Sequence, residues 1–139
     1  MKNTKKMNNK GFSLVELIIV VAIMALLVGV LAPTYLKYVE KSRISADAST
    51  VDQIVGAMEI LAADVDKTLD SSKEYTVTTT AGSDEVKLSA ELKSQLETYG
   101  INTDTYKVTS TKYKDAAFTL KLKWSTDHWE IDGVTGIPS

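Results

Sequence analysis

The stretch KGFSLVELIIVVAIMALLVGVLAPTYL, residues 10–36, decides the fold of this chain. From Leu17 to Leu36 it holds no charged residue. At about 1.5 Å per residue these positions form a helix of roughly 30 Å, which is the thickness of the hydrocarbon core of a bilayer. The stretch therefore predicts a membrane-spanning helix.

A basic segment, MKNTKKMNNKG, precedes this stretch as residues 1–11 and contains four lysines and no acidic residue. Basic flanks of a membrane helix stay on the cytoplasmic side, so we expect the residues after Leu36 to face outward. The sequence thus predicts three parts. Residues 1–11 form a leader, residues 12–36 a transmembrane or filament-core half-helix, and residues 37–139 an extracytoplasmic globular domain.

The composition of the 139 residues is that of a folded protein, with 44% apolar and 24% charged residues. The net charge is −2, and without the leader it becomes −6, from 12 basic and 18 acidic residues. An acidic exported part argues weakly against a polyanion as its partner. The chain has no cysteine, so it forms no disulfide in any compartment.

Glu16 is an acid near the start of the apolar stretch, and two common kinds of segment leave it unexplained. A secretory signal peptide has a shorter apolar region, and the one small-x-small site here, residues 30–32, is followed by Pro33. A simple membrane anchor fits the length, but an ionised acid within a membrane helix costs free energy and serves no purpose there.

The hexapeptide Gly11-Phe12-Ser13-Leu14-Val15-Glu16 follows a lysine-rich leader and precedes a long apolar helix. In this order the features resemble the N-terminal signature of type IV pilins and pseudopilins. The resemblance implies that a prepilin peptidase cuts after Gly11, that Phe12 becomes the N-methylated terminus, and that Glu16 is the glutamate of the family. Pro33 falls where many members have a proline.

The resemblance implies a structural subunit that starts as a single-pass membrane precursor and polymerises, with the pilus assembly machinery, into an extracellular type IV pilus. A pseudopilin of a secretion or DNA-uptake machine is the alternative within the family. Outside it, a membrane-anchored extracellular binding domain remains open. In its lack of cysteine the chain resembles Gram-positive members of the family. Catalysis and a cofactor are not indicated, because no phosphate loop or nucleophile elbow occurs.

A pair between Glu16 and the Phe12 amine of a neighbouring subunit would explain the charge in the apolar segment. The pair offsets the cost of a carboxylate in hydrocarbon and favours one axial stagger of the helices. The alternative is that Glu16 only reaches the headgroups at the membrane surface.

Gly29 and Pro33 form the weakest stretch of the helix, because glycine costs about 1 kcal/mol and proline about 3 kcal/mol in a helix interior. Two interpretations stay open. The pair produces either a permanent mild kink or a segment that loosens when subunits pack.

An amphipathic pattern follows Pro33 and predicts that one helix continues to about Leu69. Its apolar positions recur at spacings of three and four. Met58 and Leu61 are assigned to the core. The full stripe is Val51, Ile54, Val55, Met58, Leu61, Ala62, Val65 and Leu69.

The last seventy residues predict a small antiparallel sheet with one short helix, so the fold class is α+β and similar to that of type IV pilins. Ser89 is predicted to cap the helix, Leu88, Leu92, Leu96 and Tyr99 to share one of its faces, and Gly100 to end it. The predicted strands start at Tyr75 and then cover 106–113, 117–124 and 128–132. In the third strand, Phe118, Leu120, Leu122 and Trp124 are predicted to cover the long helix.

Three further features of the sequence suggest binding sites. Lys121 and Lys123, with Lys112 and Lys114, suggest a nucleic-acid patch, but a solvated sheet face explains them better. Asp127, Asp132 and Gly133 suggest a calcium loop, but their spacing fits no standard one. His128 is the only histidine, and no pattern of metal ligands surrounds it. No metal site is predicted, and nucleic acid stays the weaker alternative among partners.

Overall fold

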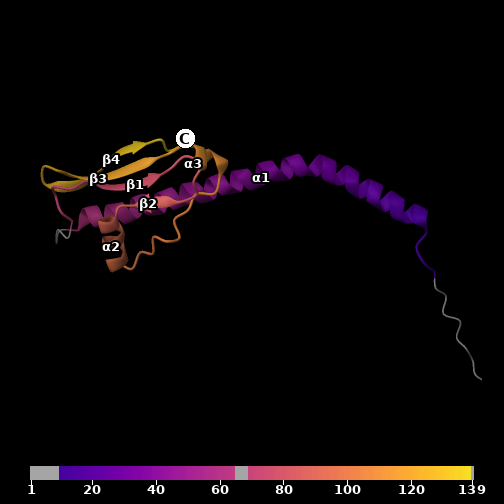
Figure 1. Ribbon diagram of the computed structural model, residues 1–139, viewed down its shortest axis with the longest axis horizontal. Coiled ribbons are helices and arrows are strands. Elements are labelled where there is room, and N and C mark those ends of the chain that lie inside the picture. The colour runs from indigo at the N-terminus through magenta and orange to yellow at the C-terminus, as the bar shows by residue number, and fades with distance from the viewer. Residues whose placement is uncertain (1–9, 65–68, 139) are drawn as a thin grey trace, which may run out of the picture. The chain divides into compact units, whose positions relative to one another are not determined.

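The structure is a computed structural model, and it describes residues 10–64 and 69–138. Contacts divide the chain into two units, Met1–Tyr38 and Val39–Ser139. The helix α1, Leu14–Ala63, belongs to both (Figure 1). Its first part is long and apolar enough to cross a membrane, by length and composition, and none of that part is buried.

The second part of α1 carries the predicted core stripe. Ile54, Met58 and Leu61 are at most 2% exposed, which confirms their assignment to the core. The helix ends at Ala63, earlier than predicted, and Val65 lies outside the described residues. Leu69 is buried without being helical.

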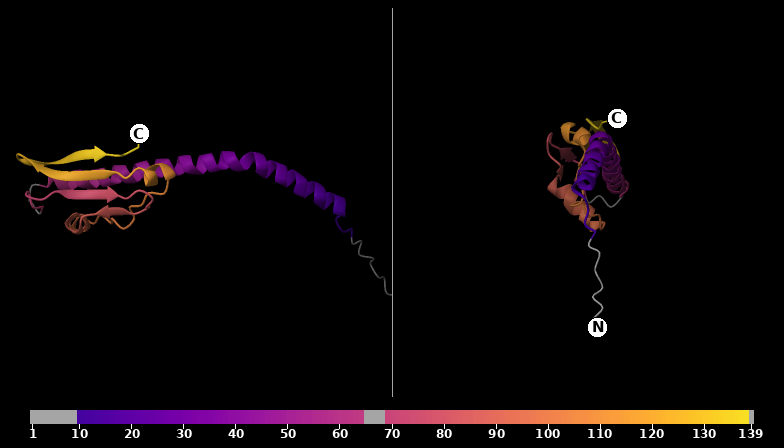
Figure 2. Two further views of the ribbon diagram at one scale, coloured as in Figure 1. Left: turned by 45° about the horizontal axis from the view of Figure 1, so that its top comes forward. Right: turned by 90° about the vertical axis from the view of Figure 1, so that its right-hand side faces the viewer.

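The sheet has four antiparallel strands in the order β2-β1-β3-β4. They are β1 Tyr75–Thr79, β2 Val86–Leu88, β3 Thr119–Ser125 and β4 His128–Thr135. The sheet lies along the second part of α1 (Figures 1 and 2). The α+β class and the antiparallel sheet are confirmed, and the last two predicted strands pair as β3 and β4.

The helix α2, Ala90–Thr98, has Ser89 at its N-cap position, as predicted, but the Ser89 side chain makes no capping hydrogen bond. Gly100, at φ +76°, ends α2 as predicted. The amides of Gly100 and Ile101 donate to the carbonyls of Glu97 and Leu96, which is the Schellman pattern.

Two of the four residues assigned to one face of α2 lie elsewhere. Leu88 belongs to β2 and Tyr99 is 43% exposed, so the prediction is wrong for both. Leu92 and Leu96 are buried as predicted.

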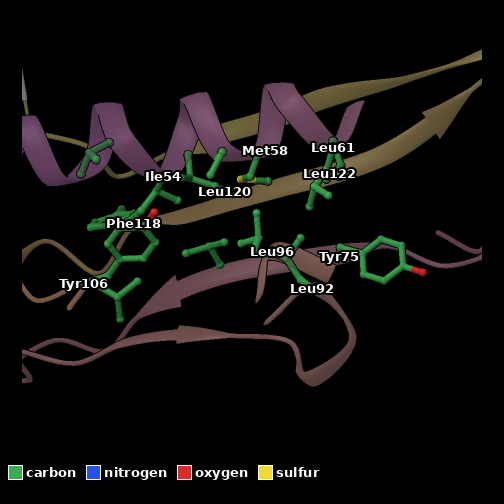
Figure 3. Packing of buried hydrophobic residues seen from close by; sticks show 14 of the residues in the cluster. Ile54, Met58, Leu61, Tyr75, Leu92, Leu96, Tyr106, Phe118, Leu120 and Leu122 are labelled. Atoms are coloured by element: carbon green, nitrogen blue, oxygen red, sulfur yellow. The ribbon is translucent and has the colours of Figure 1, made fainter. Parts of the chain in front are cut away.

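The core lies between α1 and the sheet, with α2 adding its two leucines (Figure 3). Leu120 and Leu122 are fully buried on the side of β3 that was predicted to cover α1, and Phe118, which directly precedes β3, is fully buried as well. Val77 pairs with Leu120 across the β1–β3 ladder and is also fully buried.

The predicted strand 106–113 is absent, and this prediction is wrong. Tyr106, Val108 and Ser110 alternate with exposed residues, which is why the sequence reads as a strand. Lys107 forms an isolated bridge with Glu85, which directly precedes β2, and the Val108 amide donates to the Asp84 carbonyl. Ser110 then caps a short helix, α3, Thr111–Asp115.

Candidate functional site

The predicted cleavage bond, Gly11–Phe12, precedes the first turn of α1. Residues 10–13 have no helical or strand conformation, and α1 begins at Leu14. The Phe12 side chain is 86% exposed. A peptide bond in a non-helical exposed segment can be held in extended form by a peptidase, so the local structure suits cleavage there.

The start of α1 is a capping box formed by Ser13 and Glu16. The Ser13 amide donates to Glu16 Oε2 at 2.8 Å, and the Glu16 amide donates to Ser13 Oγ at 3.2 Å. Each side chain thus satisfies an amide that the helix leaves without a partner. Ser13 was not among the predicted site residues, although the pattern Ser-x-x-Glu ahead of an apolar run is a known sign of this motif.

The capping box gives Glu16 a role within its own chain. A carboxylate has two oxygens and about four acceptor positions. The bond from Ser13 uses Oε2, so capacity remains for a second donor such as an ammonium group. Phe12 and Glu16 also line the same shallow hollow, of about 440 Å³, with Leu17 and Val20. The local structure is therefore compatible with both a capping role and a pairing role.

Gly29 and Pro33 lie inside α1, and the helix is continuous through both. Proline has no amide hydrogen, so the carbonyl four residues earlier, that of Gly29, receives no hydrogen bond from it. Nothing within 4 Å would meet a Cβ atom added to Gly29. Packing within the described chain therefore does not require glycine here, and the choice between kink and loosening stays open.

The first part of α1 exposes apolar side chains on every side. Residues 11–38 are all exposed. A helix that is apolar all round needs a membrane or other helices to cover it. The large exposed residues here include Leu14, Leu17, Ile18, Ile19, Val20, Ile23, Met24, Leu26, Leu27, Val28 and Leu31.

The lysines that suggested a nucleic-acid patch form ion pairs on the outer face of the sheet. Lys121 Nζ lies 3.2 Å from Glu74 Oε1, and Lys123 Nζ lies 3.7 Å from Asp132 Oδ2. These acids reduce the positive charge that a phosphate backbone would meet. Lys112 and Lys114 lie on α3, and for Lys112 this replaces the predicted strand 106–113.

Asp127 and Asp132, which suggested a calcium loop, each interact with a different neighbouring side chain. Asp132 pairs with Lys123, while Asp127 Oδ1 lies 2.7 Å from His128 Nδ1. Gly133 has φ +66°, a left-handed backbone conformation within β4 that favours glycine. Among residues 10–64 and 69–138, no group of three or more histidine, cysteine or acidic side chains is arranged to hold a metal ion.

Asp47 is a buried polar residue of the globular unit that was not predicted from the sequence, and its role is structural. It is 1% exposed, and its carboxylate accepts five hydrogen bonds from Thr109 and Ser110, including both of their amides at 2.7–3.0 Å. Ser110 Oγ in turn accepts from the Tyr113 amide and caps α3. Asp47 thus ties α1 to the segment before α3.

A signal for Asp47 was present in the sequence. Ile44, Asp47, Val51 and Ile54 follow spacings of three and four, so Asp47 occupies a position of the apolar stripe. A buried carboxylate needs several donors. Those donors come from residues more than 60 positions away, which the sequence pattern does not identify.

Comparison with known proteins identifies the N-terminal part of the chain. Residues 6–32 match the family described as Prokaryotic N-terminal methylation motif, which is typical of type IV pilins and pseudopilins. No curated protein and no solved structure matches the chain. The match covers the leader end, the capping box and most of the apolar part of α1. It implies processing by a prepilin peptidase and assembly into a pilus-type polymer, from a membrane-anchored precursor.

Proposed function

From the N-terminal methylation motif at residues 6–32, we propose that the chain is a prepilin, cut after Gly11, N-methylated at Phe12 and polymerised into an extracellular type IV pilus. The observation that carries the proposal is the motif, whose predicted cleavage bond, Gly11–Phe12, lies in the exposed non-helical residues directly before α1. In the precursor the leader lies in the cytoplasm and the unit Val39–Ser139 outside. The mature subunit then packs its apolar half-helix against those of other copies.

The cleavage step is tested by the intact mass and N-terminal sequence of subunits from sheared surface filaments of the native host. We expect an N-terminus at methylated Phe12. Replacement of Gly11 by a bulky residue should leave only precursor in the membrane, because the peptidase must hold the backbone closely at this position. An intact leader, or a terminus elsewhere, would rule out the proposed processing.

We propose that Glu16 pairs with the Phe12 amine of a neighbouring subunit during assembly. Cleavage creates a cationic terminus, and Glu16 lies in the first turn of α1. The Ser13 bond to Oε2 fixes the carboxylate at the helix start and leaves acceptor capacity for an ammonium group. The pair would offset the cost of removing both charges from water and would fix the stagger between neighbours.

Two substitutions separate pairing from capping. Glu16→Ala removes the charge and the cap, whereas Glu16→Gln keeps a side chain that can cap at this position but removes the charge. If pairing matters, both variants should be inserted and cleaved normally, and filament yield should fall at least tenfold in both. A large loss in Glu16→Ala with normal yield in Glu16→Gln would assign Glu16 to capping alone. Normal filaments from both would make the charge incidental.

The motif is equally typical of pseudopilins, so a pseudopilin of a secretion or DNA-uptake machine is the second candidate. The same filament preparation distinguishes the two. A major pilin should be the most abundant protein of long sheared filaments, whereas a pseudopilin should be processed at Gly11 and yet stay with the cell envelope.

A further inference from the structure

A band of tyrosine and basic residues surrounds α1 where its apolar stretch ends. Tyr35 and Tyr38 are each 68% exposed, and Lys37, Lys41 and Arg43 are exposed as well. We call these five residues the collar. They follow one another within nine positions of a continuous helix and lie on different sides of it, because each step along a helix turns by about 100°.

The collar differs in charge from everything that follows it. Residues 44–139 contain nine basic and 16 acidic residues, a net charge of −7, whereas the collar carries three positive charges. The only acid between Tyr35 and Arg43 is Glu40, and its Oε1 accepts a hydrogen bond from the Thr111 amide at 2.7 Å. Glu40 is thus directed to the globular unit, and the basic side chains are left toward solvent.

We propose that the collar binds the anionic phospholipid headgroups of the outer leaflet and fixes the depth of the helix before assembly. This inference rests on the proposed membrane-anchored precursor. Tyrosine concentrates at the membrane–water interface, and basic side chains near an anionic surface gain binding free energy. Each basic residue at such a surface increases the local preference for anionic lipid by about fivefold at most.

The spacing along α1 relates the depth of the collar in the membrane to the depth of Glu16. Lys37 lies 21 residues after Glu16 in one continuous helix, which corresponds to about 32 Å. The hydrocarbon core is about 30 Å thick. When Lys37 is held at the outer headgroups, Glu16 lies at the inner boundary of the hydrocarbon. The Gly11–Phe12 bond then lies at the inner surface of the membrane, within reach of a peptidase.

The test uses the full chain in vesicles and a single labelling site. The chain has no cysteine, so Leu36→Cys, at a position that is 67% exposed, carries one fluorophore next to the collar. Vesicles contain phosphatidylcholine and phosphatidylglycerol, and one of the two lipids is brominated at a time. Bromine quenches the fluorophore on contact, so the ratio of quenching reports which lipid lies beside the collar.

The collar variant, Lys37→Gln/Lys41→Gln/Arg43→Gln, removes three positive charges. The control, Lys87→Gln/Lys107→Gln, removes two exposed lysines far along the chain. With the native collar, phosphatidylglycerol should quench at least threefold more strongly than phosphatidylcholine. The preference should disappear in the collar variant and in 0.5 M salt, and it should persist in the control. Tryptophan fluorescence verifies that each variant is folded.

Equal quenching by the two lipids with the native collar, or an unchanged preference in the collar variant, would overturn the inference. A failure of the proposed function gives a different result. If the helix does not enter the bilayer, neither brominated lipid quenches the label. A second label at Ser13→Cys checks the depth. Lipids brominated near the headgroup should quench it more than lipids brominated at the chain ends, and the opposite order would contradict the depth that the collar sets.

Discussion

The two parts of α1 belong to one helix but differ in whether their apolar side chains are buried within the chain. From residue 14 to residue 38 every side chain is exposed, although the stretch is almost entirely apolar. From Asp47 to Leu61 one face is buried against the sheet and α2. Among the described residues the first part of α1 has no packing partner, whereas the second part packs against the sheet and α2.

The sequence pattern explains the difference. The second part alternates apolar and polar residues with the helical period, so one face can meet a sheet while the other meets water. The first part is apolar on all sides, so no single face can satisfy it. Substitutions of one kind, made in both parts, should therefore have different effects on the unfolding free energy of the globular unit.

The largest effect is expected at Asp47. Asp47→Ala should lower the free energy of unfolding by about 4 kcal/mol, because it leaves the buried Ser110 amide and the part-buried Thr109 amide without an acceptor, at about 1–3 kcal/mol each. Urea denaturation of the full chain in detergent, followed by tryptophan fluorescence, measures this. Asp52→Ala, at an exposed position of the same helix, is the control and should change the value by less than about 0.5 kcal/mol. Equal losses in both variants would contradict the role given to Asp47.

A matched pair of methionines compares the two parts directly. Met58 is fully buried and Met24 is 59% exposed. Met58→Ala should cost about 3 kcal/mol of unfolding free energy, since it leaves a cavity in the core. Met24→Ala should leave the unfolding of the globular unit unchanged in the same urea titration. A similar cost for Met24→Ala would show that the first part is packed within its own chain.

Features that depend on local pattern could be predicted from the sequence. The apolar run, the stripe through Met58 and the β3–β4 hairpin each follow from a periodicity within a few turns or strands, and the structure confirms them. The motif around Gly11 is local as well, and the comparison with the methylation family confirms it. The roles of Gly11, Phe12 and Glu16 stay predictions.

Features that depend on distant contacts could not be predicted. The segment before α3 has the alternation of a strand, but Asp47 accepts its amides and Ser110 caps α3, so it forms no ladder. The strand β2 has only three residues, which is too short for a clear pattern. Ser13 is a different case, because its capping box is local and was available in the sequence.

A serine caps the N-terminus of a helix in each of the two parts, and its removal should have a smaller effect. Ser110 caps α3 in the globular unit, and Ser13 caps α1 in the first part. Ser110→Ala should lower the unfolding free energy by about 1–2 kcal/mol, because the cap of α3 is lost together with a bond to Asp47. Ser13→Ala should leave that free energy unchanged in the same urea experiment. A loss in Ser13→Ala would indicate that the helix start stabilises the globular unit.

The smallest effect is the dependence of stability on pH that arises from His128, the only histidine of the sequence, at the start of β4. A hydrogen bond with Asp127 raises the pKa of His128 above 6.5, and the charge of Glu130 acts in the same direction. Because the pKa is higher in the folded state, the stabilisation is present below pH 6.5 and is lost as the pH rises through the raised pKa. The side chain is exposed, so the change in thermal midpoint should be slight. NMR titration of the His128 ring gives the pKa directly, and Asp127→Asn should lower it toward 6.5 and reduce the pH dependence, to which Glu130 still contributes. A titration of His128 that is unchanged in Asp127→Asn would show that the contact at the β3–β4 turn does not persist in solution.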